Sequence, residues 1–263
     1  MAETLTALIL GDVIGRSGSR AVFTHLKQII KQTRAEFVVV NAENATDGFG
    51  LTPEVVENLF AAGTTVITTG NHVWQQREIL RTLDDEPRLL RPANYPPEAP
   101  GHGLWVDATD SGIAVINLQG RRRMVPTDCP FRKANDLLKG VQGKAKIVFV
   151  DFHAESTEEK EALAHHLDGK ITALVGTHTH VPTNDARVLP KGTAFQTDLG
   201  SCGPRETVIG FNPEISVRRA LTQLPLRNEV SENPALLNGV VIKADRSTGH
   251  ALSIDRYSFT ATI

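Results

Sequence analysis

The N-terminal part of the sequence alternates short apolar runs with amphipathic segments, and this alternation constrains the fold most strongly. The apolar runs 5–10, 37–40 and 66–69 are typical of buried strands. Segment 17–31 repeats apolar residues at helical spacing, and a second helix is predicted to begin at Thr52-Pro53, because threonine caps helices and proline suits their first turn. Strand–helix–strand order with right-handed crossovers predicts a parallel sheet.

The second half of the chain repeats this order and adds further strands. Strands are predicted at 146–152 and 171–176, with a helix between them from Ser156 or Thr157 to about 166. A loop is predicted over 87–103 and a turn at Asp110-Ser111-Gly112. The remaining expected elements are strands at 104–106, 113–117, 192–197, 239–244 and 251–259, and a helix from Asn212-Pro213 to about 221. We therefore expect an α/β fold in which a second sheet packs on the first, within one domain spanning 1–263.

Composition sets the broad class of protein. The chain is 40% hydrophobic and 22% charged, with a formal net charge of −2, so we expect a globular protein without stable nucleic-acid binding. Its two cysteines, Cys129 and Cys202, have no metal-binding spacing and are predicted to be free thiols. No signal peptide and no transmembrane run is apparent, which favours the cytoplasm; assembly into a homo-oligomer is left open.

Polar side chains follow the predicted strands directly. In parallel sheets, ligands collect beyond the carboxyl ends of the strands, so these side chains are expected to meet at one edge. A pair of transition-metal ions needs mixed oxygen and imidazole ligands. The candidates are the carboxylates Asp12 and Glu43, the imidazoles His153, His178 and His180, and the amide Asn71, with Asn44 as a further amide.

Roles within this set differ. Glu43 is the better bridge between two metal ions because its side chain is longer than that of Asp12. Such ions, roughly 3.5–4 Å apart, would polarise a phosphoryl oxygen and hold a hydroxide in line with phosphorus. His72 follows a candidate ligand and is interpreted as a general acid that protonates the leaving oxygen. Arg121 could reach a substrate phosphate, but an exposed loop position is the simpler interpretation.

These motifs resemble those of the calcineurin-like metallophosphoesterases. The matching segments are Gly11-Asp12, Asn41-Ala42-Glu43-Asn44, Gly70-Asn71-His72, His153 and Gly176-Thr177-His178-Thr179-His180, against the superfamily signature DxH, GDxxD, GNHE/D, a separate His and GHxH. Ile14 replaces the histidine of DxH, and Glu43 replaces the acidic residue of GDxxD. These departures, together with Asp151–Glu155 and Arg91–Asn94, are similar to the YmdB-type phosphodiesterases.

The resemblance implies a four-layer sandwich of two mixed β-sheets flanked by helices. It divides the candidate ligands between two ions bridged by Glu43: Asp12, Asn44 and His180 hold one, and Asn71, His153 and His178 hold the other. It also implies iron or manganese as the metal, His72 as the proton donor and 2′,3′-cyclic nucleotides as the favoured phosphodiester substrates. Ile14 leaves the first metal with fewer imidazole ligands than in the wider superfamily.

Two other functions use the same residues. A phosphomonoesterase such as a nucleotidase would share the metal ligands and differ in the walls of its pocket. A regulatory protein could use the site to sense a nucleotide without hydrolysing it. The proton donor expected at His72 favours an enzyme, because a protein that only binds its ligand needs none.

Overall fold

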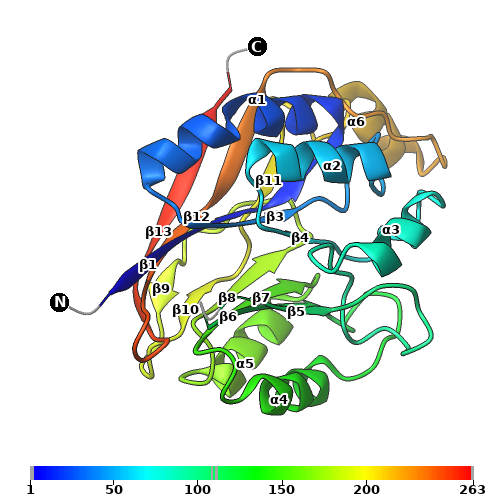
Figure 1. Cartoon of the computed structure of the whole chain (residues 1–263). Coiled ribbons are helices and arrows are strands. Elements are labelled where there is room, and N and C mark those ends of the chain that lie inside the picture. The colour runs from blue at the N-terminus through cyan, green and yellow to red at the C-terminus, as the bar shows by residue number, and fades with distance from the viewer. Residues whose placement is uncertain (1–2, 108, 110–111, 262–263) are drawn as a thin grey trace.

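Four layers make up the structure in the computed structural model, which describes residues 3–107, 109 and 112–261. Two mixed sheets face each other, α1 and α2 cover the outer face of one, and α4 and α5 cover the outer face of the other (Figure 1). This confirms the fold class predicted from the sequence. Asp110 and Ser111 of the predicted turn lie outside the described residues.

The first sheet is built on the N-terminal strands. β1, β3 and β4 are parallel, as the strand–helix order predicted, and β12 pairs antiparallel with β1. β12 also pairs with β13 and with β11, which in turn pairs parallel with β2. Its strands in the described residues are β1 Thr4–Leu10, β2 Asp12–Val13, β3 Phe37–Asn41, β4 Val66–Thr68, β11 Ser201–Pro204, β12 Ala235–Asp245 and β13 Ala251–Thr260.

The second sheet has a parallel centre and antiparallel edges. β6, β7, β8 and β10 are parallel, whereas β5 and β9 pair antiparallel at the two edges. Its strands in the described residues are β5 Leu104–Val106, β6 Ile113–Gln119, β7 Ile147–His153, β8 Ala173–Thr177, β9 Arg187–Val188 and β10 Ala194–Gln196. Because the parallel strands of each sheet end at one edge, the residues that follow them are gathered there.

Side-chain alternation along β1 shows how the layers are held together. Leu5, Ala7 and Ile9 point into the core between the two sheets, where they join residues such as Phe149 of β7. Leu8 and Leu10 point the other way, into the core beneath α1 and α2. A buried strand with both faces apolar forms a continuous apolar run in the sequence, which is why the pattern located β1 so closely.

Helix starts follow their capping residues. Thr52 and Ser156 accept hydrogen bonds from the backbone N–H groups of Val55 and Glu159, and Asn212 caps the last helix. The helices are α1 Gly15–Thr33, α2 Pro53–Ala62, α3 Ile79–Asp85, α4 Pro130–Val141, α5 Thr157–Leu167 and α6 Pro213–Thr222. α3, α4 and the short strands β2, β9 and β11 were not predicted from the sequence. α3 and these strands are too short to show a clear period, whereas α4 has Phe131, Ala134 and Leu138 at helical spacing and does carry a helix signal.

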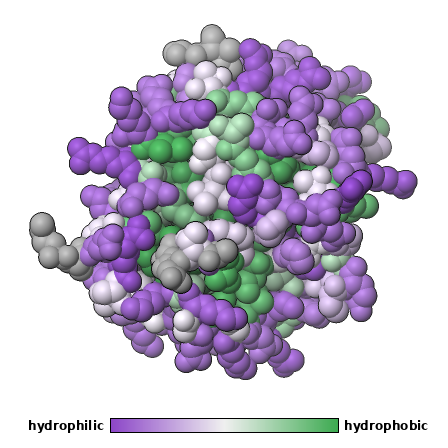
Figure 2. Space-filling model, in the orientation of Figure 1, coloured by the Kyte–Doolittle hydropathy of each residue, from purple (hydrophilic) through white to green (hydrophobic). Residues whose placement is uncertain are grey.

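The molecular surface agrees with the composition. Polar residues cover most of the face in Figure 2, with apolar residues showing between them near the centre. Cys129 and Cys202 are free thiols, as predicted. In the described part of the chain, no helix is long and apolar enough to cross a membrane.

Candidate metal centre

The predicted polar residues meet at the carboxyl ends of the strands, as expected. Asp12 begins β2, Glu43 and Asn71 follow β3 and β4, and His153 ends β7. His178 and His180 follow β8, the neighbour of β7 in the second sheet. Gly70 shows how tightly they pack, because a Cβ atom there would lie 2.2 Å from the His153 ring and 2.4 Å from Oε2 of Glu43.

His153 lies at the centre of one group of candidate ligands. Its Nε2 lies 3.1 Å from Oε1 of Glu43 and 3.0 Å from Oδ1 of Asn71. Nδ1 of His178 lies 3.0 Å from the same Nε2. Ligand atoms about 2.0–2.2 Å from one metal ion lie roughly 3 Å from one another. The spacing therefore fits one metal ion held by these four side chains.

Asp12, Asn44 and His180 form a second group beside Glu43. Nδ2 of Asn44 lies 3.1 Å from Oε1 of Glu43 and 3.1 Å from Nε2 of His180. Oδ1 of Asp12 is buried, has no hydrogen-bond partner in the described part of the chain, and lies 4.0 Å from the same His180 nitrogen. A buried carboxylate oxygen without a donor is costly, and a cation would satisfy it. Asp12 and His180 therefore fit a second metal ion, and Asn44 could join them through Oδ1 if its amide were turned over.

The backbone around His178 and His180 is strained and held by specific hydrogen bonds. Both residues have positive φ, 101° and 64°, which is unusual for a side chain larger than glycine. The His178 N–H donates to Oδ2 of Asp12, and the Thr179 N–H donates to Oδ2 of Asp198. Asp198 is itself buried and paired with Lys160 at 2.7 Å. These contacts hold the two imidazoles at different positions, as separate metals require.

A hydrogen-bond relay sets the tautomer of His153. The Thr177 hydroxyl donates its only hydrogen to Oδ1 of Asp151, at 2.7 Å, and lies 2.9 Å from Nδ1 of His153. It must therefore accept the Nδ1 hydrogen of His153. Once His153 gives up its second proton, its lone pair is on Nε2, the atom that faces Glu43. Such outer contacts orient metal-binding histidines.

Replacing Thr177 with valine should weaken the metal centre without removing a ligand. Valine keeps the shape but leaves Nδ1 of His153 without its acceptor, and metal affinity should fall about 10–100-fold. The measurement is metal binding by titration against a competing chelator. Thr177→Ser retains the hydroxyl and should bind metal like the parent protein; equal affinity in all three proteins would contradict the relay.

Charge interactions in the cluster are strong because its members are buried. Burial raises the pKa of Asp12 to about 6. Burial also opposes the ionisation of Glu43, but His153 and His72 outweigh it and lower the pKa of Glu43 well below its usual value. For His153, burial is outweighed by the Glu43 charge, which raises the pKa to about 9, whereas burial and the His153 charge lower the pKa of His178 to about 3. A cation bound to His153 must displace its proton, so metal uptake should release protons.

His72 stands apart from the two groups. Its Nδ1 lies 2.7 Å from Oδ1 of Asn44, and its backbone N–H donates to Oε2 of Glu43. The side chain is 25% exposed, and the Phe49 ring packs against the imidazole edge at 5.1 Å. With Nδ1 engaged by Asn44, Nε2 is the nitrogen left for a substrate. Because an amide oxygen only accepts, the Nδ1 hydrogen faces Asn44 in this arrangement, and a neutral ring has its lone pair on Nε2.

Arg121, for which contact with a substrate phosphate was left open, lies on the surface. Arg121 is exposed, its backbone N–H donates to Glu159, and its guanidinium contacts the Cys129 sulfur at 3.5 Å. Thr177 and Lys160, which support the site, were not predicted from the sequence. For Asp151, which accepts the Thr177 hydrogen bond, the sequence did contain a signal. Asp151 precedes His153 by two positions on a strand, so the two side chains share one face of the sheet.

The fold and the site define an α/β sandwich with a candidate two-metal centre at its strand ends. A family model described as YmdB-like protein matches residues 8–257. The chain belongs to the YmdB-like family, which confirms the resemblance seen in the motifs.

Relatives of the chain are similar over nearly its whole length. The 2′,3′-cyclic-nucleotide 2′-phosphodiesterase of Bacillus subtilis (strain 168) is 44% identical, and the match covers 95% of each chain. A crystal structure of a hypothetical protein from Thermus thermophilus has a TM-score of 0.92 at 38% identity, over 98% of this chain and 100% of that one. A crystal structure of a novel phosphatase from Mycoplasma pneumoniae has a TM-score of 0.93 at 36% identity, over 99% and 95%.

Proposed function

We propose that the chain is a metal-dependent phosphodiesterase whose preferred substrates are 2′,3′-cyclic nucleotides. The observation that carries this proposal is the convergence of Glu43, Asn71 and His178 on Nε2 of His153. One ion is assigned to these four side chains, and a second to Asp12, Asn44 and His180, with Glu43 bridging. Since both sheets supply ligands, we propose that 1–263 acts as a single domain.

Iron or manganese is the proposed metal, because mixed imidazole, carboxylate and amide ligands suit first-row transition metals. When bound, two such ions would polarise the phosphoryl group and activate water. The phosphodiester class agrees with the named activity of the Bacillus subtilis relative. With a net charge of −2, we propose a small nucleotide partner in the cytoplasm, without stable nucleic-acid or membrane binding.

His72 would give a proton to the leaving oxygen through Nε2. In the structure, the Asn44 amide directs Nδ2 toward Glu43 and His180 and Oδ1 toward Nδ1 of His72. Turning this amide over would place its oxygen toward the metal ligands and let its NH₂ group donate to Nδ1 of His72. The His72 proton would then be on Nε2, as a general acid requires.

The central test compares metal-loaded protein on two kinds of ester. Purified protein is first analysed for its elements, with about two transition-metal ions per chain expected. Hydrolysis of bis-p-nitrophenyl phosphate and 2′,3′-cyclic AMP is then compared with that of nucleoside monophosphates. Faster turnover of the diesters is expected; preference for monoesters would indicate a nucleotidase, and tight binding without turnover would indicate a nucleotide sensor.

A further inference from the structure

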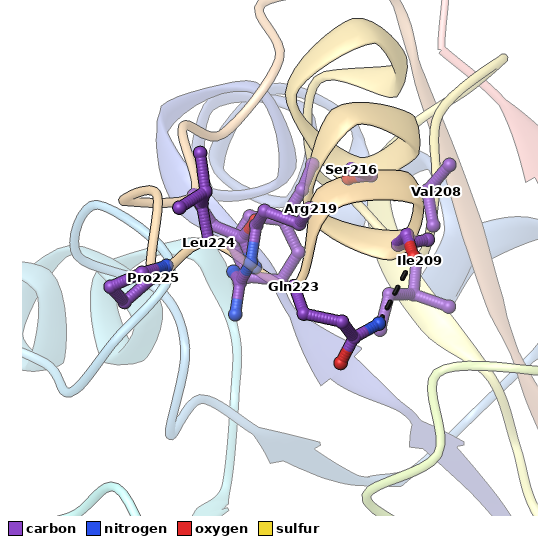
Figure 3. Close-up of a pocket in the computed structure, with 10 residues that line it drawn as sticks. Val208, Ile209, Ser216, Arg219, Gln223, Leu224 and Pro225 are labelled. Carbon is purple, nitrogen blue, oxygen red and sulfur yellow. Dashed lines mark hydrogen bonds between the residues drawn. The ribbon is translucent and has the colours of Figure 1, made fainter.

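A cavity of about 440 Å³ lies beside α6, in a part of the fold that supplies no candidate metal ligand. Figure 3 shows Arg219 and Gln223, near the end of α6, beside Val208 and Ile209 of the segment that precedes the helix. Phe211 and Asn228 also line it. Cavities of roughly 300–1,000 Å³ accommodate small ligands, so this one is large enough for part of a nucleotide.

The wall of this cavity contacts one candidate ligand directly, His180, and is linked to His72 through Phe49. The Ile209 carbonyl accepts a hydrogen bond from Nδ1 of His180 at 3.1 Å, so one imidazole ring separates it from the nitrogen that faces the centre. Phe211 stacks on Phe49 at 5.7 Å, and Phe49 packs against His72 at 5.1 Å. The cavity is therefore linked to the candidate metal centre through the His180 ring.

Apolar side chains line the cavity although they are exposed to solvent. Val208 is 42% exposed, Ile209 is 47% exposed and Leu224 is 49% exposed. Phe211 adds an aromatic ring to the same wall. Apolar surface of this kind is stabilised when a flat, weakly hydrated group covers it, and aromatic rings are such groups.

Polar groups in the same cavity lack partners. Oδ1 of Asn228 is buried and accepts no hydrogen bond from the residues that the structure describes. The Gln223 amide nitrogen donates to the Ala220 carbonyl, and its oxygen can accept a hydrogen bond from a ligand. Arg219 has no acidic partner within ion-pair distance among the residues that the structure describes. The cavity thus offers hydrogen-bond acceptors, a cationic donor and an apolar wall.

We propose that this cavity is the nucleobase subsite of the enzyme, an inference that rests on the proposed phosphodiesterase function. Asn228 accepts a hydrogen bond from an amino or ring N–H group of the base, and the Arg219 guanidinium faces a ring nitrogen or carbonyl. The base covers the apolar wall beside Phe211. A second phosphate fits less well, because Oδ1 of Asn228 requires a donor and phosphate oxygens only accept.

The test compares the binding of a ligand that contains a nucleobase with the binding of a ligand that lacks one. Metal-loaded protein is titrated with adenosine 3′-monophosphate and with inorganic phosphate by calorimetry. Asn228→Leu keeps the size of the side chain but removes the acceptor, and Arg219→Ala removes the cation. Each variant should raise the Kd for adenosine 3′-monophosphate about five- to tenfold, the effect of one lost hydrogen bond, and leave the Kd for phosphate unchanged. The value of kcat/KM for 2′,3′-cyclic AMP should fall by the same factor.

Arg218→Ala is the matched control, because Arg218 is exposed on the same helix and lines a different hollow. It should bind both ligands like the parent protein. The subsite is wrong if the parent protein binds adenosine 3′-monophosphate no tighter than phosphate, if both variants retain its affinity, or if phosphate affinity falls equally. Failure of the proposed phosphodiesterase function is distinguishable from failure of the subsite. In that case the metal-loaded parent protein hydrolyses no diester, whereas the Kd values for adenosine 3′-monophosphate and phosphate still show whether the cavity binds a base.

Discussion

Glu43→Ala is expected to lose bound metal and activity together. Glu43 is fully buried and is the candidate side chain placed beside both groups of ligands, with Oε1 3.1 Å from Nε2 of His153 and 3.1 Å from Nδ2 of Asn44. Its removal deletes a ligand shared by the two proposed ions. Metals contribute several kcal/mol to such reactions, so activity should fall roughly a thousandfold or more. Elemental analysis and hydrolysis of bis-p-nitrophenyl phosphate measure the two losses.

Glu57→Ala provides the control, because Glu57 is an exposed carboxylate on α2, away from the strand ends. It should retain both metal ions and full activity. Circular dichroism should show that Glu43→Ala remains folded. A folded Glu43→Ala protein with two metal ions and unchanged turnover would refute the bridging role.

His72→Ala is expected to lose turnover while it retains its metals. His72 contacts Asn44 and Glu43 but lies outside the group centred on His153. Loss of a general acid typically lowers the rate about 10²–10⁴-fold. The loss should be large for 2′,3′-cyclic AMP, whose leaving alkoxide needs a proton, and much smaller for bis-p-nitrophenyl phosphate, whose leaving phenolate is stable without one.

His102→Ala is the matched control, because His102 is an exposed histidine in the loop before β5. It should act on both substrates like the parent protein. Equal loss on both substrates by His72→Ala would contradict proton donation. If His72→Ala instead loses its bound metals, His72 is a metal ligand.

Comparison of Glu43→Ala with His72→Ala separates metal binding from proton transfer, even though Glu43 and His72 are in contact. The His72 backbone N–H donates to Glu43, so Glu43→Ala also disturbs the placement of His72. His72→Ala leaves every side chain around Nε2 of His153 in place. Metal content distinguishes the variants more directly than activity, because activity falls in both.

Much of the fold could be predicted because its signals are local. The run before Asp12 is apolar on both faces of β1, and Thr52 and Ser156 cap their helices through contacts three residues along the chain. Strand order then implied which edge of the sheet would hold the polar residues, and all seven candidate ligands lie there. β11 has four residues and is too short to show a period, whereas α4 has apolar residues at helical spacing that indicate a helix, although none was predicted there.

By itself, the sequence determined the α/β class, the edge of the sheets that carries the candidate centre and the residue types that could hold metal. Only the tertiary structure decided which of those atoms approach one another, such as Nε2 of His153 and Oε1 of Glu43, and which hydroxyl supports the ring. It also brought the segment after α6 to the cavity near His180. The physical reason is range: periodicity and capping act over a few residues, whereas these contacts join side chains far apart in the chain, such as Asn44 and His180, which are 136 positions apart.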